Sequence, residues 1–205
     1  MRPYRSHLPF AAPVLLYFLC GAVLLIALPY GAEVLYFNAW RTPTAGAVVA
    51  ALTKLGEAWA YAIAAAALLW SRRYKQAAYV VTTGLLVIPL AFVLKDLFAV
   101  PRPATYFEMT GQADLLVTPS DVLVYTGMTS FPSGHTFAAF ALYTALALIT
   151  PRPYRGWGLL WAALAITTAL TRIFLAQHFV PDVLFGAALG ILLAYALWLL
   201  FRRYF

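Results

Sequence analysis

Residues 9–28 read PFAAPVLLYFLCGAVLLIAL, an apolar run of 20 residues without a charged side chain. An α-helix of this length rises about 30 Å, which matches the thickness of the hydrocarbon core of a bilayer. A cleavable signal sequence has an apolar segment of about half this length, followed by small residues. Here the run is followed instead by aromatic residues typical of a membrane interface: Tyr30, Tyr36, Phe37 and Trp40. The stretch therefore predicts a transmembrane helix that is retained.

The rest of the chain has the composition of an integral membrane protein. Of its 205 residues, 64% are hydrophobic and 10% are charged, whereas a soluble domain carries about 25% charged residues. No change in composition divides the chain, so residues 1–205 are interpreted as one domain. We expect an all-α fold, a six-helix transmembrane bundle, and an interfacial helix at 45–54 that leads into the second span. The predicted spans are 9–28, 55–70, 77–94, 133–149, 156–171 and 183–201.

The distribution of charge predicts the orientation of these spans, because basic residues mark the cytoplasmic side. If the N-terminus is cytoplasmic, the inner segments hold nine basic residues and no acidic one. The outer segments then hold five basic residues and all seven acidic ones. We therefore expect both termini in the cytoplasm. The net charge of +7 is explained by this orientation, and the dispersed basic residues do not indicate nucleic-acid binding.

This topology brings a set of polar residues to one outer membrane face. The third and fifth spans run outward, while the fourth and sixth run inward from the same side. The short segments between them carry the remaining members of the set. The candidate site residues gathered in this way are Lys95, Arg102, Ser133, Gly134, His135, Arg172, His178 and Asp182.

The residue types in this set favour phosphate chemistry. Three permanent cations at a membrane edge require an anion, and arginine binds phosphate oxygens in pairs. Ser133 and Gly134 open a helix whose free N–H groups attract anions. Asp182 follows His178 by four residues and can hold one ring nitrogen. Two histidines and a lone Cys20, without a carboxylate cluster, favour acid–base and nucleophilic chemistry over a metal site.

Each feature has an ordinary explanation when it is considered alone. A lysine or arginine at the end of a span anchors the helix at the interface, and Ser133 can be a simple helix cap. His178 and Asp182 can form a surface pair, and Glu57 is interpreted as an interfacial partner of Lys54. Residues 104–130 are interpreted as a solvated loop over the site, with substrate selection as the alternative. The convergence of the set on one face nevertheless predicts an active site.

Three sequence patterns carry a family resemblance. They are Lys95-x6-Arg102-Pro103, Pro132-Ser133-Gly134-His135 and Arg172-x5-His178-x3-Asp182. In order and spacing they resemble the signature of the type 2 phosphatidic acid phosphatase superfamily, over residues 95–182. Thr171 departs from the serine that is frequent in the family.

The resemblance implies a mechanism without metal or cofactor. His178 would attack phosphorus and form a phosphohistidine, and Asp182 would orient it. His135 would protonate the leaving group and then activate water. The residues that would bind the phosphate are Lys95, Arg102, Ser133, Gly134 and Arg172.

The expected substrate is a lipid phosphate, because a site at span ends can be reached sideways from the bilayer. Resembling bacterial proteins recycle undecaprenyl pyrophosphate at the periplasmic face, so this lipid is the first candidate. Phosphatidylglycerophosphate, phosphatidic acid and lipid A phosphate remain open. A phosphotransferase and a non-catalytic lipid-phosphate binder are the alternatives of another class. We expect a multi-pass protein of the bacterial inner membrane, and the sequence does not indicate protein partners.

Overall fold

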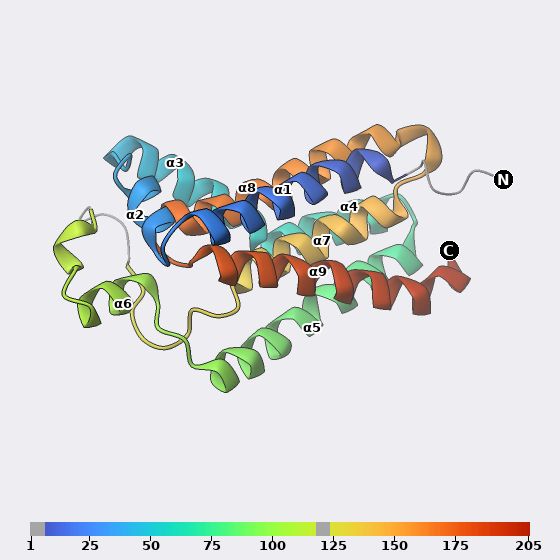
Figure 1. Ribbon diagram of the computed structural model, residues 1–205. Helices are drawn as coiled ribbons and strands as arrows, with labels where there is room; N and C mark the ends of the chain where they lie inside the picture. Colours follow the sequence, from blue (N-terminus) through green and yellow to red (C-terminus); the bar gives the residue numbers. More distant parts are fainter. Residues whose placement is uncertain (1–6, 118–123) are drawn as a thin grey trace.

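The computed structural model describes residues 7–117 and 124–205, and the regular elements within these ranges are all helices (Figure 1). The predicted all-α class is confirmed. The α-helices are α1 (Leu8–Ala27), α2 (Ala32–Asn38), α3 (Pro43–Thr53), α4 (Ala58–Trp70), α5 (Tyr74–Phe98), α6 (Pro103–Met109), α7 (Gly134–Ile149), α8 (Gly158–Phe174) and α9 (Val180–Phe201). The 3-10 helices are η2 (Lys54–Gly56), η3 (Ala113–Leu115), η4 (Arg152–Trp157) and η5 (Arg202–Tyr204).

Within residues 7–117 and 124–205, four helical segments are long and apolar enough to cross a membrane. They contain α1, α5, α8 and α9. The pair α3 and α4, bent by 53° at its break, would make a fifth span if counted as one. A helix coincides with each of the six predicted stretches, but α7 has 16 residues and rises about 24 Å, less than the bilayer core. The structure thus supports four or five spans where the sequence predicts six.

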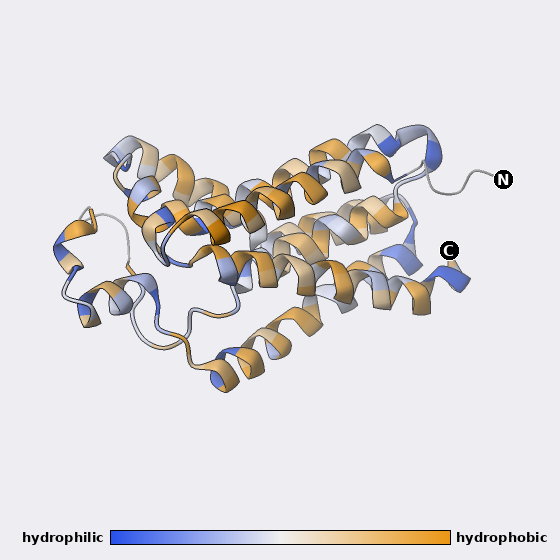
Figure 2. Cartoon of the chain, in the orientation of Figure 1, coloured by the Kyte–Doolittle hydropathy of each residue, from blue (hydrophilic) through white to orange (hydrophobic). Residues whose placement is uncertain are grey.

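Polarity is concentrated at the two ends of the bundle, while the middle of the long helices is apolar (Figure 2). The start of α1 and the end of α9 lie at one end, and α2, α3 and α6 lie at the other (Figure 1). Large aliphatic side chains such as Leu16, Ile26 and Leu85 are exposed along the bundle. In water this surface would be unstable, whereas acyl chains of a bilayer solvate it.

Helix α7 forms the centre of the bundle and packs against α5, α8 and α9. Eleven of its 16 residues are buried. Helix α9 approaches it closely through Gly186 and Gly190, because a Cβ at Gly190 would lie 2.6 Å from the Phe137 carbonyl oxygen. Small residues at four-residue spacing allow such close packing of membrane helices. This contact fixes the start of α9 against the start of α7, where the candidate site residues lie.

The break between α3 and α4 also packs against α7. A Cβ at Gly56 would lie 2.6 Å from the carbonyl oxygen of His135. Glycine at this position therefore allows η2 to approach the first turn of α7. Helix α3 begins with Pro43 and with a cap from Thr42, whose side chain accepts from the N–H of Ala45 at 3.2 Å.

Two features differ from the sequence prediction. Helices α5 and α8 continue beyond the predicted ends at 94 and 171, because backbone hydrogen bonding does not stop where polar residues begin. The interpretation of 104–130 as a solvated loop is wrong for its first part, which forms α6 and buries Phe107. Asp121, one of the seven acidic residues predicted on the outer side, lies outside the described residues.

Candidate active site

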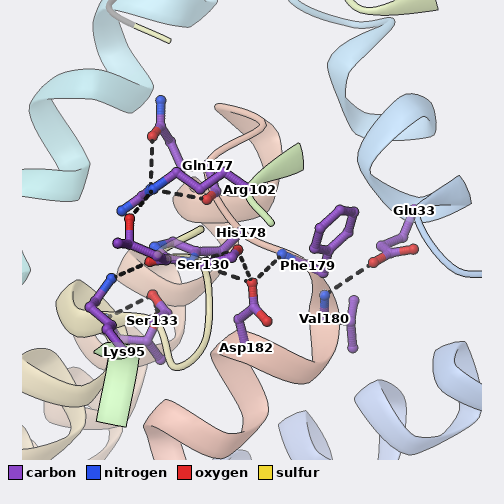
Figure 3. Close-up of polar contacts among 12 residues, drawn as sticks. Glu33, Lys95, Arg102, Ser130, Ser133, Gln177, His178, Phe179, Val180 and Asp182 are labelled. Carbon is purple, nitrogen blue, oxygen red and sulfur yellow. Dashed lines mark hydrogen bonds and ion pairs between the residues drawn. The ribbon is translucent and has the colours of Figure 1, made fainter. Parts of the chain in front are cut away.

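The predicted site residues lie at the ends of helices at one end of the bundle. Lys95 and Arg172 are in the last turns of α5 and α8, and Asp182 is in the first turn of α9. Arg102 precedes α6, and His178 lies in the turn between α8 and α9. Ser133, Gly134 and His135 begin α7. Figure 3 labels five of these residues together with their neighbours: Lys95, Arg102, Ser133, His178 and Asp182.

A buried hydrogen-bond network surrounds His178 (Figure 3). Its Nδ1 lies 3.4 Å from Oδ2 of Asp182 and 3.5 Å from Oγ of Ser130. The same Oδ2 accepts from the Ser130 hydroxyl at 2.5 Å and from the N–H of Phe179 at 3.0 Å. These two donors stabilise a carboxylate that is removed from water. The network orients the ring by its Nδ1 side.

The surroundings of His178 favour its neutral form. Burial, followed by the charges of Arg172, Arg102 and Lys95, lowers the pKa of His178 well below its usual value. A hydrogen bond to Ser130 acts in the opposite direction but is the smallest effect. At neutral pH the imidazole therefore carries a lone pair, which is the form required of a nucleophile.

Lys95 and Arg102 meet at Thr129, in the segment before α7. The ammonium of Lys95 donates to the Thr129 carbonyl at 2.6 Å, and Nε of Arg102 donates to its hydroxyl at 3.0 Å. Arg102 also donates to the Gln177 carbonyl at 3.3 Å, and its guanidinium lies 5.2 Å from the ring centre of Tyr125. One cation from the last turn of α5 and one from the segment before α6 are thus held at Thr129, and Arg102 also contacts the turn that carries His178.

Arg172 is the most buried of the three cations, with 4% of its surface exposed. Its Nη1 donates to the Thr53 hydroxyl at 2.7 Å. Its Nε has no hydrogen-bond partner among residues 7–117 and 124–205. A buried donor without a partner is costly unless an anion completes the site. The guanidinium is therefore suited to a phosphate oxygen.

The start of α7 provides backbone N–H groups at the site. The Ser133 hydroxyl caps the helix, with Oγ 3.5 Å from the N–H of Thr136 and 3.0 Å from its hydroxyl. The Ser133 N–H donates to the Asp182 carbonyl at 3.1 Å, which links α7 to α9. A Cβ at Gly134 would meet Lys95 Cε at 3.9 Å and nothing closer. The space in front of Gly134 is thus open to a ligand next to Lys95.

His135 lies at the edge of a cavity of about 610 Å³ between α4 and α5. Lys95, Gly134 and Glu57 form the polar end with it, and apolar side chains such as Val87 and Phe92 form the remainder. Nε2 of His135 lies 3.7 Å from Oε1 of Glu57. A cavity of this size, with its polar groups at one end, fits a ligand with a charged head and an apolar chain.

The sequence prediction missed several of these contacts. Ser130 lies three residues before Ser133, and Thr53 contacts Arg172 across more than a hundred residues. A buried hydroxyl has no local signal, so neither could be identified from spacing. Glu57 was predicted to pair with Lys54, but in the structure its carboxylate faces His135. In the part of the chain that the structure describes, no three His, Cys, Asp or Glu side chains form a metal-binding group.

Comparison with known proteins identifies the family of the chain. A family model described as the PAP2 superfamily matches residues 75–205. The lipid A 1-phosphatase of Rhizobium etli is 34% identical over 113 residues, which cover 55% of this chain and 45% of the relative. Phosphatidylglycerophosphatase B of Bacillus subtilis is 35% identical over 78 residues, which cover 35% of this chain and 38% of the relative. The match to each of these relatives thus spans less than half of its length.

Two solved structures share the fold. LpxE of Aquifex aeolicus is 25% identical with a TM-score of 0.59, over 79% of this chain and 90% of that one. A transmembrane PAP2 type phosphatidylglycerolphosphate phosphatase from Bacillus subtilis has a TM-score of 0.69, over 96% of this chain and 97% of that one. At 21% identity, the second likeness concerns the fold alone.

Proposed function

The chain belongs to the PAP2 superfamily and is a multi-pass membrane protein, and from this premise we propose that it hydrolyses the phosphate or pyrophosphate of a membrane lipid without a metal ion. One observation carries the proposal. A buried, neutral histidine with a carboxylate partner lies among three cations, and one of these cations, Lys95, lines an apolar cavity together with His135. Cations, nucleophile and apolar cavity are what cleavage of a lipid phosphate requires.

In the first step Nε2 of His178 attacks phosphorus while Asp182 holds Nδ1. The bond from phosphorus to the lipid oxygen breaks, and His135 gives that oxygen a proton. Lys95, Arg102, Arg172, Ser133 and the N–H of Gly134 stabilise the equatorial oxygens of the transition state. In the second step His135 takes a proton from water, the water oxygen bonds to phosphorus, and the phosphohistidine is cleaved.

The cavity supports a lipid as the substrate. Its polar end holds His135 and Lys95, and its apolar walls come from α4 and α5, whose outer faces carry exposed aliphatic side chains. Undecaprenyl pyrophosphate is our first candidate. The names of the relatives favour a lipid A phosphate or phosphatidylglycerophosphate as alternatives, and phosphatidic acid remains a further one. A phosphotransferase would use the same phosphohistidine with another acceptor, whereas a lipid-phosphate binder would not form it.

We further propose six spans with both termini in the cytoplasm and the site at the periplasmic face of the bacterial inner membrane. The start of α1 and the end of α9 lie at the end of the bundle opposite the site (Figure 1). Arg72, Arg73 and Arg202 lie at that same end of the bundle. In a Cys20→Ser background, single cysteines at positions 74 and 114 test this orientation with an impermeant thiol reagent on intact cells. Labelling at 114 is expected, and labelling at 74 instead would contradict the topology.

The function is tested by phosphate release from a panel of lipids in detergent micelles. The panel holds undecaprenyl pyrophosphate, phosphatidylglycerophosphate, phosphatidic acid and lipid A, with His178→Ala as the inactive control. We expect release from at least one lipid, unchanged by EDTA and inhibited by orthovanadate, which adopts the five-coordinate geometry of the transition state. If no lipid releases phosphate, a non-catalytic lipid-phosphate binder is favoured. If EDTA abolishes phosphate release and magnesium restores it, the metal-independent mechanism is contradicted.

A further inference from the structure

Glu57 occupies a position that the proposed mechanism does not yet use. It lies at the break between α3 and α4, at the polar end of the cavity. Its carboxylate oxygen Oε1 is 3.7 Å from Nε2 of His135, and its side chain is partly exposed to the cavity. This distance is longer than a direct hydrogen bond and fits an electrostatic contact or a bridging water.

The local backbone holds Glu57 at this place. The bend of 53° between α3 and α4 turns the chain toward the first turn of α7. Gly56 allows the approach, because any side chain there would collide with the carbonyl of His135 and with Thr168. Glu57 is also the N-cap residue of α4, but its side chain makes no cap hydrogen bond. A capping role therefore does not account for the direction of the carboxylate, which is toward His135.

The charges around His135 explain what the carboxylate supplies. Burial of His135 disfavours an imidazolium, and the cations Arg172, Lys95 and Arg102 act in the same direction. Yet a group that protonates the lipid oxygen must carry a proton before the reaction. Glu57 is the carboxylate that faces His135. Its negative charge favours the protonated ring and also fixes the ring's orientation.

We propose that Glu57 is a positioning residue that directs His135 into the cavity and opposes, with its negative charge 3.7 Å away, the groups that disfavour the protonated ring in the first step of the reaction. This inference rests on the proposed function. In that step the proton moves from His135 to the departing lipid oxygen, while the bond between phosphorus and that oxygen breaks and the bond between phosphorus and His178 forms. Glu57 exchanges no proton and touches no reacting atom. Its carboxylate stabilises the charge on His135 before the transfer and the returning charge after water is activated.

The test compares two leaving groups in the variant Glu57→Gln, which keeps the size of the side chain and removes its charge. Phosphatidic acid has an alkoxide leaving group that needs a proton, whereas p-nitrophenolate leaves without one. We expect kcat/KM for phosphatidic acid to fall by about 10- to 100-fold, as for other residues that act through a neighbouring group. For p-nitrophenyl phosphate it should fall by less than about threefold. The basic limb of the pH profile for phosphatidic acid should move to lower pH.

Three further variants separate positioning from structural damage. Glu57→Asp should recover part of the activity on phosphatidic acid, and Glu108→Gln, on the exposed surface of α6, should behave as wild type. In the His135→Ala background, Glu57→Gln should cause no additional loss, because the residue acts through His135. Equal losses on both substrates, additive losses, or an unshifted pH profile would overturn the proposal. A wild-type protein that releases no phosphate would instead contradict the proposed function itself.

Discussion

The two histidines of the site each face a carboxylate, but their surroundings are opposite. In the pair of His178 and Asp182 the side chains are 2% and 1% exposed, and the closest atoms are 3.4 Å apart. In the pair of His135 and Glu57 they are 34% and 40% exposed and 3.7 Å apart. The first pair is enclosed by Ser130 and Phe179, whereas the second borders the cavity.

The difference in exposure between the two pairs corresponds to two chemical roles, a nucleophile and a general acid and base. A nucleophile has to be neutral and fixed in line with phosphorus, and burial with several hydrogen bonds achieves both. A group that gives a proton to a lipid oxygen and later takes one from water has to reach both of them. Such a group belongs at the edge of a cavity. The exposure of each pair thus supports the proposed assignment of His178 as nucleophile and His135 as acid and base.

Removing the buried imidazole should have the largest effect. We expect His178→Ala to lower kcat for lipid phosphate by about 10⁴-fold or more, because removing a nucleophile leaves only binding and charge stabilisation. The loss should be the same for p-nitrophenyl phosphate, since no leaving group compensates for a missing nucleophile. Phosphate release measured with both substrates checks this. A variant that retained a few per cent of the activity on either would show that His178 is not the nucleophile.

Removing a residue that holds Asp182 should lower activity less than removing His178 itself. Ser130→Ala removes the 2.5 Å hydrogen bond to Asp182 and leaves the carboxylate with the Phe179 N–H. Loss of an outer partner of this kind costs about 10- to 100-fold in activity. Ser71→Ala is the matched control, because Ser71 is exposed and bonds to the carbonyl of Ala67 in its own helix. A loss as small as that of the control would mean that Ser130 does not hold Asp182 in the active state.

Replacing Arg172 should have a smaller effect on activity. Its charge acts near both histidine–carboxylate pairs. Its Nη1 is held by Thr53, so Nε remains for the substrate. Lysine provides a charge but cannot make both contacts at once. We expect Arg172→Lys to lower kcat/KM by about 10- to 30-fold, and Arg203→Lys, an exposed residue at the opposite end, to have no effect. An unchanged kcat/KM in Arg172→Lys would show that charge alone is sufficient there.

Acid should weaken the fold through the protonation of His178. Because the folded state lowers the pKa of His178, the unfolded chain binds the proton first as the pH falls. The stability that the neutral ring contributes is complete above about pH 6.5 and is lost below it, with a limiting slope of about 1.4 kcal/mol per pH unit. Chemical unfolding of wild type and His178→Asn at pH 7, 6 and 5 measures this difference. Parallel curves would contradict a depressed pKa at His178.

The apolar runs were sufficient to predict the six long helical stretches but not the short helices α2 and α6, because hydropathy and length report only on segments that a bilayer can accept. The same count placed Lys95, Arg172 and Asp182 at one end without reference to any contact. The run 133–149 matches α7 to within one residue, but it was counted as a full span although 16 residues rise less than the bilayer core. The count also missed Ser130 and Glu57, whose positions depend on the packing of distant segments. Glu57 is brought to His135 by the close approach at Gly56.

The assignment of the two histidines is tested most directly by a burst experiment with p-nitrophenyl phosphate in His135→Ala. This leaving group needs little protonation, so His178 should still be phosphorylated, while hydrolysis of the phosphohistidine lacks its base. The account predicts a burst of p-nitrophenol close to one equivalent, a slow steady state, and acid-labile phosphate bound to His178. His178→Ala should show neither burst nor label. Phosphate found on His135, or in the His178→Ala variant, would contradict the account.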